Sequence, residues 1–210
     1  NRRFQLERLI LFSDAVFAIA ITLLIIEIKI PSFDHRITGH ELGEALLEKL
    51  PEFIGFIISF AVIGQFWTSH HRLFGYVSNY TGGVLWLNLL MLFWIVLMPF
   101  STHLNMQYGN LDITWCWYSL NLALTEFSVL LMWRYLARHP ELTNLSNEPA
   151  LLRHFFRSSI LVLFIFLSGA FLTFLPWVWV KWLSRFVFAL IFPVLKVHRR
   201  RYEKKKKPVI

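Results

Sequence analysis

Polar side chains are rare in the long apolar stretches of this sequence, and three of them have chemistry to offer. Asp14 and Thr22 lie within "LFSDAVFAIAITLLIIEI", residues 11–28, and Glu126 lies within "LALTEFSVLLMW". Inside a membrane, a carboxyl group binds a cation, relays a proton or pairs with another polar group. A threonine hydroxyl offers an oxygen to a cation or bonds its own backbone one turn back. These residues are therefore the first candidates for function.

Motifs for catalysis are absent from the sequence. There is no phosphate-binding loop, no HExxH, no GxSxG and no cluster with metal-ligand spacing. His70 and His71 are adjacent, so on a helix they point about 100° apart and share a metal poorly. The single cysteine, Cys116, excludes an intrachain disulfide. We therefore expect no enzyme and no cofactor, which leaves transport or assembly in a membrane.

The composition predicts that membrane-spanning helices position these groups. Of the 210 residues, 56% are hydrophobic and 17% are aromatic, which is too apolar for a soluble domain of this length. A helix needs roughly 20 mostly apolar residues to cross a bilayer, because lipid offers no partner to unpaired backbone groups. We predict an all-α polytopic membrane protein with a single transmembrane domain over 1–210. Its six spans run approximately over 8–30, 51–69, 84–104, 113–134, 158–176 and 178–197, followed by a basic tail at 198–210.

The distribution of Lys and Arg predicts the orientation of the spans. If the N-terminus is cytoplasmic, 16 basic residues fall on the cytoplasmic side and 4 on the other, so both termini are assigned to the cytoplasm. The net charge of +8 is then explained by topology, and no nucleic-acid partner is needed. The tail "HRRRYEKKKK" is also suited to anionic lipid headgroups. Asp14 interrupts the first apolar run, which continues past Ala20, so we expect no cleaved signal peptide.

The two polar groups of the first span lie on different faces of the predicted helix. At about 100° per residue, Ser13 and Asp14 lie roughly 120–140° away from Ile19. The opposite face of this helix is equally apolar, so hydropathy does not decide which face lines anything. One stripe, within about 60° of Ile19, contains Phe12, Ala15, Val16, Thr22, Leu23, Ile26 and Ile30.

Asp14 requires a partner, because an unpaired carboxylate inside the membrane boundary is costly. The second span runs antiparallel to the first and ends in "FWTSHHRLF" on the same side. We predict that Ser13 and Asp14 tie the base of the first helix to this end of the second. The alternative is that Asp14 binds ions or relays protons itself. The candidate partners are Trp67, His70, His71 and Arg72.

Glu126 is the deepest acid outside the first span. No second acid or basic residue stands at a matching depth in the sequence, which favours a structural glutamate that is protonated or partnered. A place in a cation or proton pathway is the alternative.

The start of the first span resembles a known family. Arg8, followed four residues later by "FSDAVFAIAIT" and a Leu/Ile run that ends near Glu27, is similar to the signature that opens the transmembrane protein 175 family of potassium channels. The predicted six-span layout, the "FWTSHHRLF" segment and the length resemble the prokaryotic members with one six-span unit. Ala15 is a departure, because many prokaryotic relatives have glycine there.

The resemblance implies a homotetramer in the prokaryotic plasma membrane, in which four first helices surround a central pore. It places the hydrophobic constrictions on Ile19, Leu23 and Ile26, and the threonine ring, with a potassium ion near it, on Thr22. It assigns Arg8, Phe12, Ser13 and Asp14 to the structural base of the first helix. The sequence has no "TVGYG"-like filter, in agreement with such a pore.

Rings of Ile and Leu would gate by excluding water, and a ring of Thr22 hydroxyls would supply oxygen contacts. This predicts a channel with modest preference for potassium over sodium. A proton or weakly selective cation channel that uses Asp14 or Glu126, a proton-coupled transporter and a non-conducting membrane scaffold are the alternatives. A transporter would need a cavity with several polar groups, and the stripe holds only Thr22.

Overall fold

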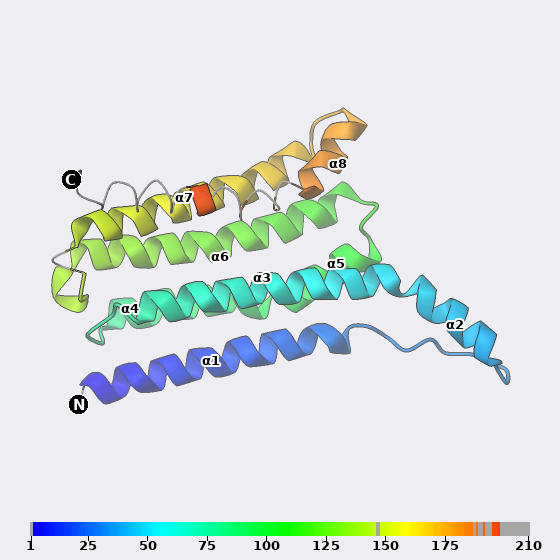
Figure 1. Ribbon diagram of the computed structural model, residues 1–210, viewed down its shortest axis with the longest axis horizontal. Coiled ribbons are helices and arrows are strands. Elements are labelled where there is room, and N and C mark those ends of the chain that lie inside the picture. Colours follow the sequence, from blue (N-terminus) through cyan, green and yellow to red (C-terminus); the bar gives the residue numbers. More distant parts are fainter. Residues whose placement is uncertain (1, 146–147, 187, 189–190, 192–194, 198–210) are drawn as a thin grey trace, which may run out of the picture.

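A computed structural model describes residues 2–145, 148–186, 188, 191 and 195–197 of the chain. The long helices run side by side along one axis and form an elongated bundle (Figure 1). The α-helices are α1 (Arg2–Ile26), α2 (Gly39–Glu48), α3 (Leu50–Phe74), α4 (Gly82–Val96), α5 (Met98–Gln107), α6 (Asp112–Arg138), α7 (Pro149–Leu172) and α8 (Val178–Phe186), and a 3-10 turn, η1, covers Pro140–Leu142.

The first helix, α1, is uninterrupted because its 25 residues include neither glycine nor proline. It packs against α3, α4 and α5. One of its faces is buried in these contacts through Phe17, Ala20 and Leu24, each at most 2% exposed. The opposite face is open, so the packing distinguishes two faces that hydropathy could not.

The predicted third span, 84–104, is divided in the structure. Helix α4 ends at Val96 and α5 begins at Met98, with Pro99 in the first turn of α5. Proline has no backbone N–H and its ring clashes with the preceding turn, so a continuous helix is disfavoured here. The two helices together still form one apolar segment, Gly82–Gln107, long enough to cross a membrane.

Four segments of the described chain are long and apolar enough to span a membrane: Phe4–Ile26, Leu50–Phe74, Gly82–Gln107 and Pro149–Leu172. Six were predicted. The predicted fourth span, 113–134, is part of the 27-residue α6, but this helix also buries Asn121, Glu126 and several hydroxyls and is not among the four. The predicted sixth span, 178–197, starts as the nine-residue α8 and then lies partly outside the described residues.

The fifth predicted span, 158–176, begins earlier in the structure. Helix α7 starts at Pro149, so the last part of the polar segment that connects the fourth and fifth predicted spans is helical. Proline is favoured in the first turn of a helix, where its missing N–H would be unpaired anyway. The preceding connector is joined to the α3–α4 loop, where the Ser78 N–H donates to the Leu142 carbonyl at 2.9 Å.

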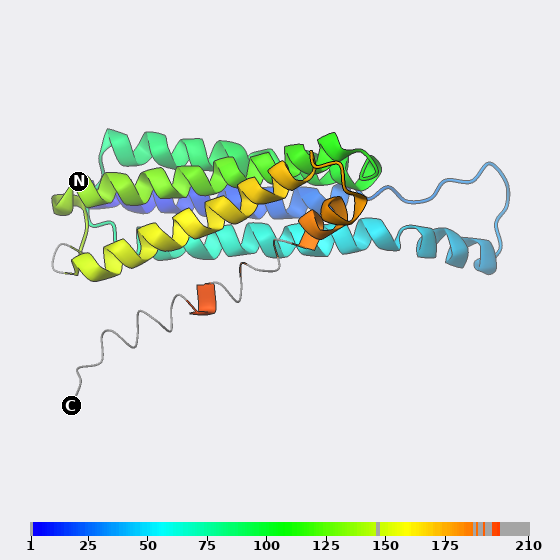
Figure 2. The ribbon, with the colours of Figure 1, turned by 90° about the horizontal axis from the view of Figure 1, so that it is seen from above.

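Leucines at helical spacing, Leu42, Leu46 and Leu50, predict a short amphipathic helix between the first two spans. The structure has such a helix there, α2, which ends at Glu48. Figure 2 shows that α2 continues the line of α3 beyond the end of the bundle. A capping box begins the helix, because the Glu41 N–H donates to the Thr38 hydroxyl and the Thr38 N–H donates to the Glu41 carboxylate.

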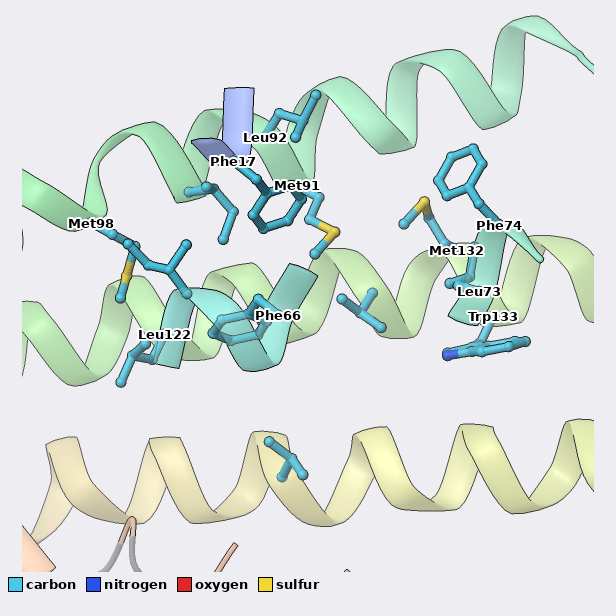
Figure 3. Packing of buried hydrophobic residues seen from close by; sticks show 14 of the residues in the cluster. Phe17, Phe66, Leu73, Phe74, Met91, Leu92, Met98, Leu122, Met132 and Trp133 are labelled. Carbon is cyan, nitrogen blue, oxygen red and sulfur yellow. The ribbon is translucent and has the colours of Figure 1, made fainter. Parts of the chain in front are cut away.

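The apolar core contains buried side chains from α1, α3, α4, α5, α6 and α7. Its side chains interleave along the bundle axis (Figure 3). This packing fixes the rotation of α1 and therefore decides which of its residues are exposed. The labelled members are Phe17, Phe66, Leu73, Phe74, Met91, Leu92, Met98, Leu122, Met132 and Trp133.

Candidate functional site

The base of α1 is held by a chain of buried hydrogen bonds that starts at Ser13. The Ser13 hydroxyl donates to the Leu9 carbonyl at 2.8 Å and accepts from Asn88 Nδ2 of α4 at 2.9 Å. The Asn88 carbonyl oxygen lies 2.8 Å from His70 Nε2 of α3. Because the Asn88 amide nitrogen donates to Ser13, its oxygen accepts, and His70 Nε2 therefore carries a proton. Three helices are thus fastened at one level.

Asp14 has a separate partner. Its carboxylate accepts a hydrogen bond from Trp67 Nε1 of α3 at 2.9 Å. The Trp67 ring lies against His71, with 5.7 Å between ring centroids. Within the part of the chain that the structure describes, neither His71 nor Arg72 forms a hydrogen bond or ion pair with Asp14. The carboxylate is therefore used for packing α1 against α3.

Of the four partners considered from the sequence, Trp67 contacts the motif directly and His70 reaches it through another residue. That residue, Asn88, was not assigned to the motif from the sequence. The only signal for it was an amide inside the apolar run "VLWLNLLML". Such an amide needs a buried partner, but a single sequence does not say which one.

The stripe on the open face of α1 keeps its side chains exposed in the subunit. Ile19 is 58% exposed, Leu23 39% and Ile26 69%. Thr22 is exposed beside them, and its hydroxyl donates to the Ile19 carbonyl at 2.9 Å. A donating hydroxyl retains oxygen lone pairs, so Thr22 can still offer an acceptor. Thr22 is the polar position among these apolar side chains.

Arg8 and Phe12 lie on the surface of α1. Arg8 places its guanidinium 5.8 Å from the centre of the Phe4 ring, and Phe12 is half-exposed. The contact with Phe4 is a local one within the first turns of the helix. Of the residues assigned to the base of the first helix, Ser13 is buried and Asp14 is partly buried.

The far end of α1 is also tethered. Glu27, which follows Ile26 directly, lies 3.5 Å from His103 Nδ1 of α5. Both side chains are partly exposed, so solvent screens the interaction. The exposed stripe therefore lies between the contacts at the base and a weaker contact at the opposite end.

Glu126 belongs to a different place in the fold. It is buried on α6 and hydrogen-bonded to Ser159 of α7. No cationic partner is found for it among the described residues. Since it lies between α6 and α7, it is separated from the α1 stripe by the helix packing.

Metal binding by clustered ligands finds no support in the described residues, where no group of three or more His, Cys, Asp or Glu side chains could hold an ion. One subunit offers a single hydroxyl at Thr22, whereas a dehydrated potassium ion needs several oxygens. A potassium site near Thr22 would therefore need more than one copy of the chain.

Comparison with known proteins shows that part of the chain is similar to a protein family. Residues 8–99 match the family model described as "Endosomal/lysosomal potassium channel TMEM175". A Streptomyces collinus protein named as a potassium channel is 36% identical over 131 residues, which cover 60% of this chain and 62% of that protein. A Chryseobacterium protein, also named as a potassium channel, is 42% identical over 95 residues, 45% of this chain and 46% of that protein.

A human relative, named as an endosomal/lysosomal proton channel, is 37% identical over 101 residues, 45% of this chain and 20% of that protein. The matches thus span less than two thirds of these relatives' lengths. Among solved structures, a crystal structure described as a lysosomal potassium-selective channel TMEM175 homologue from Chamaesiphon minutus superposes with a TM-score of 0.74. It is 27% identical, and the match covers 94% of this chain and 98% of that one.

Proposed function

We propose that the chain is a member of the TMEM175 family and the subunit of a potassium-permeable cation channel of a prokaryotic plasma membrane. The observation that carries this proposal is the open face of α1, where Ile19, Leu23 and Ile26 are exposed around Thr22. The bacterial relatives are named as channels, in keeping with the expectation of no enzyme activity. The basic residues of the sequence support cytoplasmic termini.

The proposed path needs several copies of the chain. The stripe lies on the outside of one bundle and encloses nothing by itself. A homotetramer brings four stripes around one axis, so that Ile19, Leu23 and Ile26 form apolar rings. Closed symmetry with the same surface on every subunit is the ordinary arrangement of membrane and soluble oligomers. The contacts at both ends of α1 support this arrangement, because they hold the helix in one rotation.

Each ring has a stated role in the proposal. The apolar rings exclude water when they are narrow, and ions do not cross without water or oxygen ligands. Four Thr22 hydroxyl oxygens supply such ligands between the rings. Potassium gives up its hydration shell at lower cost than sodium, so the path prefers potassium modestly.

A proton-conducting or weakly selective channel is the second candidate. Its support is that the human and chicken relatives are named as proton channels. The stripe between Phe12 and Ile26 has no titratable side chain, so protons would have to cross on water. A proton-coupled transporter has less support, because the stripe has one polar group.

Ion flux through purified protein in liposomes tests the proposal. The wild type is expected to carry potassium faster than sodium under bi-ionic gradients, and Ile19→Asn is expected to raise the basal flux of both ions by hydrating the first ring. An Ile57→Asn variant, whose exposed position is on α3, is the control and should not raise flux. The proposal would be contradicted if liposomes with the wild-type protein, and those with Ile19→Asn, carried neither potassium nor sodium.

A further inference from the structure

The rotation of α7 is fixed by contacts along its inner face. Near its start, Phe155 stacks on Trp133 of α6 with 4.7 Å between ring centroids. One turn later, Ser159 bonds to Glu126. Further along, Gly169 faces α6 and Phe188, because a Cβ there would lie 3.4 Å from the Ser119 hydroxyl oxygen and 2.7 Å from a ring carbon of Phe188. These contacts are distributed along α7 and hold it in one rotation, so they also determine which residues lie on its outer face.

The outer face of α7 carries one continuous stripe. Its positions, 153, 157, 160, 164, 167 and 171, follow one another at intervals of three or four residues. The last three are apolar and open: Phe164 is 65% exposed, Leu167 41% and Phe171 66%. The first two are arginines. This stripe changes from cationic to apolar along the helix.

Arg153 and Arg157 are exposed and unpaired within the described chain, where no acidic side chain lies at ion-pair distance from either. They stand one turn apart, so both guanidinium groups can reach the same group. Arginine presents a planar fork of N–H donors that matches the oxygens of a phosphate. Two forks on one face suit a single phosphate better than they suit two separate carboxylates.

The spacing of these side chains along α7 matches the dimensions of one lipid leaflet. With α7 starting at Pro149 on the cytoplasmic side, Arg153 and Arg157 lie about 6 and 12 Å from its start. Phe164 and Leu167 follow about 10 and 15 Å beyond Arg157. Half of the hydrocarbon core of a bilayer is about 15 Å thick, so the arginines and these two apolar side chains fit the headgroup and the acyl chains of one leaflet.

We propose that this stripe binds an anionic phospholipid of the cytoplasmic leaflet, with Arg153 and Arg157 holding the phosphate and Ile160, Phe164 and Leu167 lying along an acyl chain. The site is independent of the channel activity and distinct from the basic tail. A free phosphate would use the arginines alone, whereas the apolar part of the stripe continues directly from them. Anionic headgroups are the complementary charge for basic residues at this level of a membrane.

Native mass spectrometry of the purified protein in detergent tests the site. We expect phosphatidylglycerol to be retained in preference to phosphatidylcholine of the same acyl chains. Retention should fall by about thirtyfold in Arg153→Gln/Arg157→Gln, because two basic contacts to the phosphate are lost. The matched control is Arg134→Gln/Arg138→Gln, which removes the same charge with the same spacing from exposed positions on α6. It should retain the lipid.

Two further arms keep the test decisive. Arg153→Lys/Arg157→Lys keeps the charge and should fold like the wild type, with reduced but measurable retention, since lysine lacks the fork. Glycerol 3-phosphate in excess should not displace the lipid. Equal losses in the α6 and α7 double variants, no preference for phosphatidylglycerol, or complete displacement by glycerol 3-phosphate would each overturn the proposal.

Discussion

At the scale of single residues, the polar groups of α1 are divided between two tasks. Ser13 and Asp14 are turned toward α3 and α4, where each finds a hydrogen-bond partner. Thr22 is turned away from the bundle, and its hydroxyl donates to the Ile19 carbonyl of its own helix. A buried polar group must be paired, whereas an exposed hydroxyl keeps an oxygen available for an ion. The first group positions the helix and the second is free for function.

The Asp14–Trp67 hydrogen bond is testable on its own. Trp67→Phe removes the indole donor and keeps an aromatic ring, so we expect a loss of about 1.5 to 3 kcal/mol in unfolding free energy, as for a hydrogen bond to a charged group. Thermal unfolding of the purified protein measures it. Trp86→Phe, at an exposed tryptophan of α4, is the control. An equal effect of the two substitutions would contradict the importance of this bond.

Substitution of Asn88 should lower stability more than Trp67→Phe, because Asn88 is hydrogen-bonded to two residues. Asn88→Leu leaves the buried Ser13 hydroxyl and His70 Nε2 each without its bond to Asn88, so we expect a loss of about 2 to 4 kcal/mol in unfolding free energy. Chemical denaturation in detergent measures this loss. The exposed amide Gln65 of α3 supplies the control, Gln65→Leu, which should change stability little. If Asn88→Leu were as stable as that control, the chain of bonds would not fasten α1.

At the scale of elements, α2 depends on pH through its capping box. Hydrogen bonds from the Thr38 backbone and side chain lower the pKa of Glu41 below its ordinary value of 4.5. A lowered pKa means that the ionised form stabilises the helix. The contribution is complete above the pKa of the unfolded chain and is lost as pH falls through the lower pKa of the folded one.

We therefore expect the amides of α2 to lose protection below about pH 4.5, which hydrogen exchange corrected for intrinsic rates would measure. Thr38→Ala should lower protection at neutral pH and remove most of this pH dependence. Protection in the wild type that is unchanged between pH 7 and pH 3 would show that the cap does not hold α2.

The contact between α6 and α7 gives the test of Glu126. Glu126→Gln keeps a hydrogen-bonding group beside Ser159, so folding and the ratio of potassium to sodium flux should both stay as in the wild type. Glu126→Leu removes the bond to Ser159 and should lower stability without altering the flux ratio. A changed ratio in Glu126→Gln would bring this acid into the conduction path.

Hydropathy and residue spacing predicted some of the helices and missed other features of the fold. The apolar runs predicted the positions of α1, α3 and α7, and leucine spacing predicted α2. The break at Pro99 and the early start of α7 at Pro149 depend on how a proline is accommodated, and hydropathy does not report this. The faces of α1 could not be separated from the sequence, because both are apolar and only the packing of Phe17 and Leu24 distinguishes them.

At the scale of the whole molecule, one subunit is a scaffold that presents an open helix face. Its helices bury one side of α1 and fasten the base through two sets of hydrogen bonds. The partners of Ser13 and Asp14 required the fold, since Asn88 is 75 residues from Ser13 in the sequence. The proposed pore and its fourfold symmetry require four copies of the chain around one axis.

Assembly is the first consequence at this scale. We expect the purified protein to have the mass of a tetramer, after subtraction of detergent, by light scattering. In the proposed tetramer, the exposed stripe of each subunit faces the fourfold axis. Ile26→Arg places four charges on this axis and should therefore weaken the tetramer or block the path. A monomer that still conducts potassium would contradict the proposed assembly.

The most direct test of the central claim is the accessibility of α1 positions during conduction. In a Cys116→Ser background, cysteine is placed at Thr22 or Ile26 on the open face and at Ala20 on the buried face, and a charged thiol reagent is added while potassium flux is recorded. We expect the reagent to block flux at Thr22→Cys and Ile26→Cys and to leave Ala20→Cys unaffected. Block at Ala20→Cys alone, or no block at either open position despite modification, would contradict this claim.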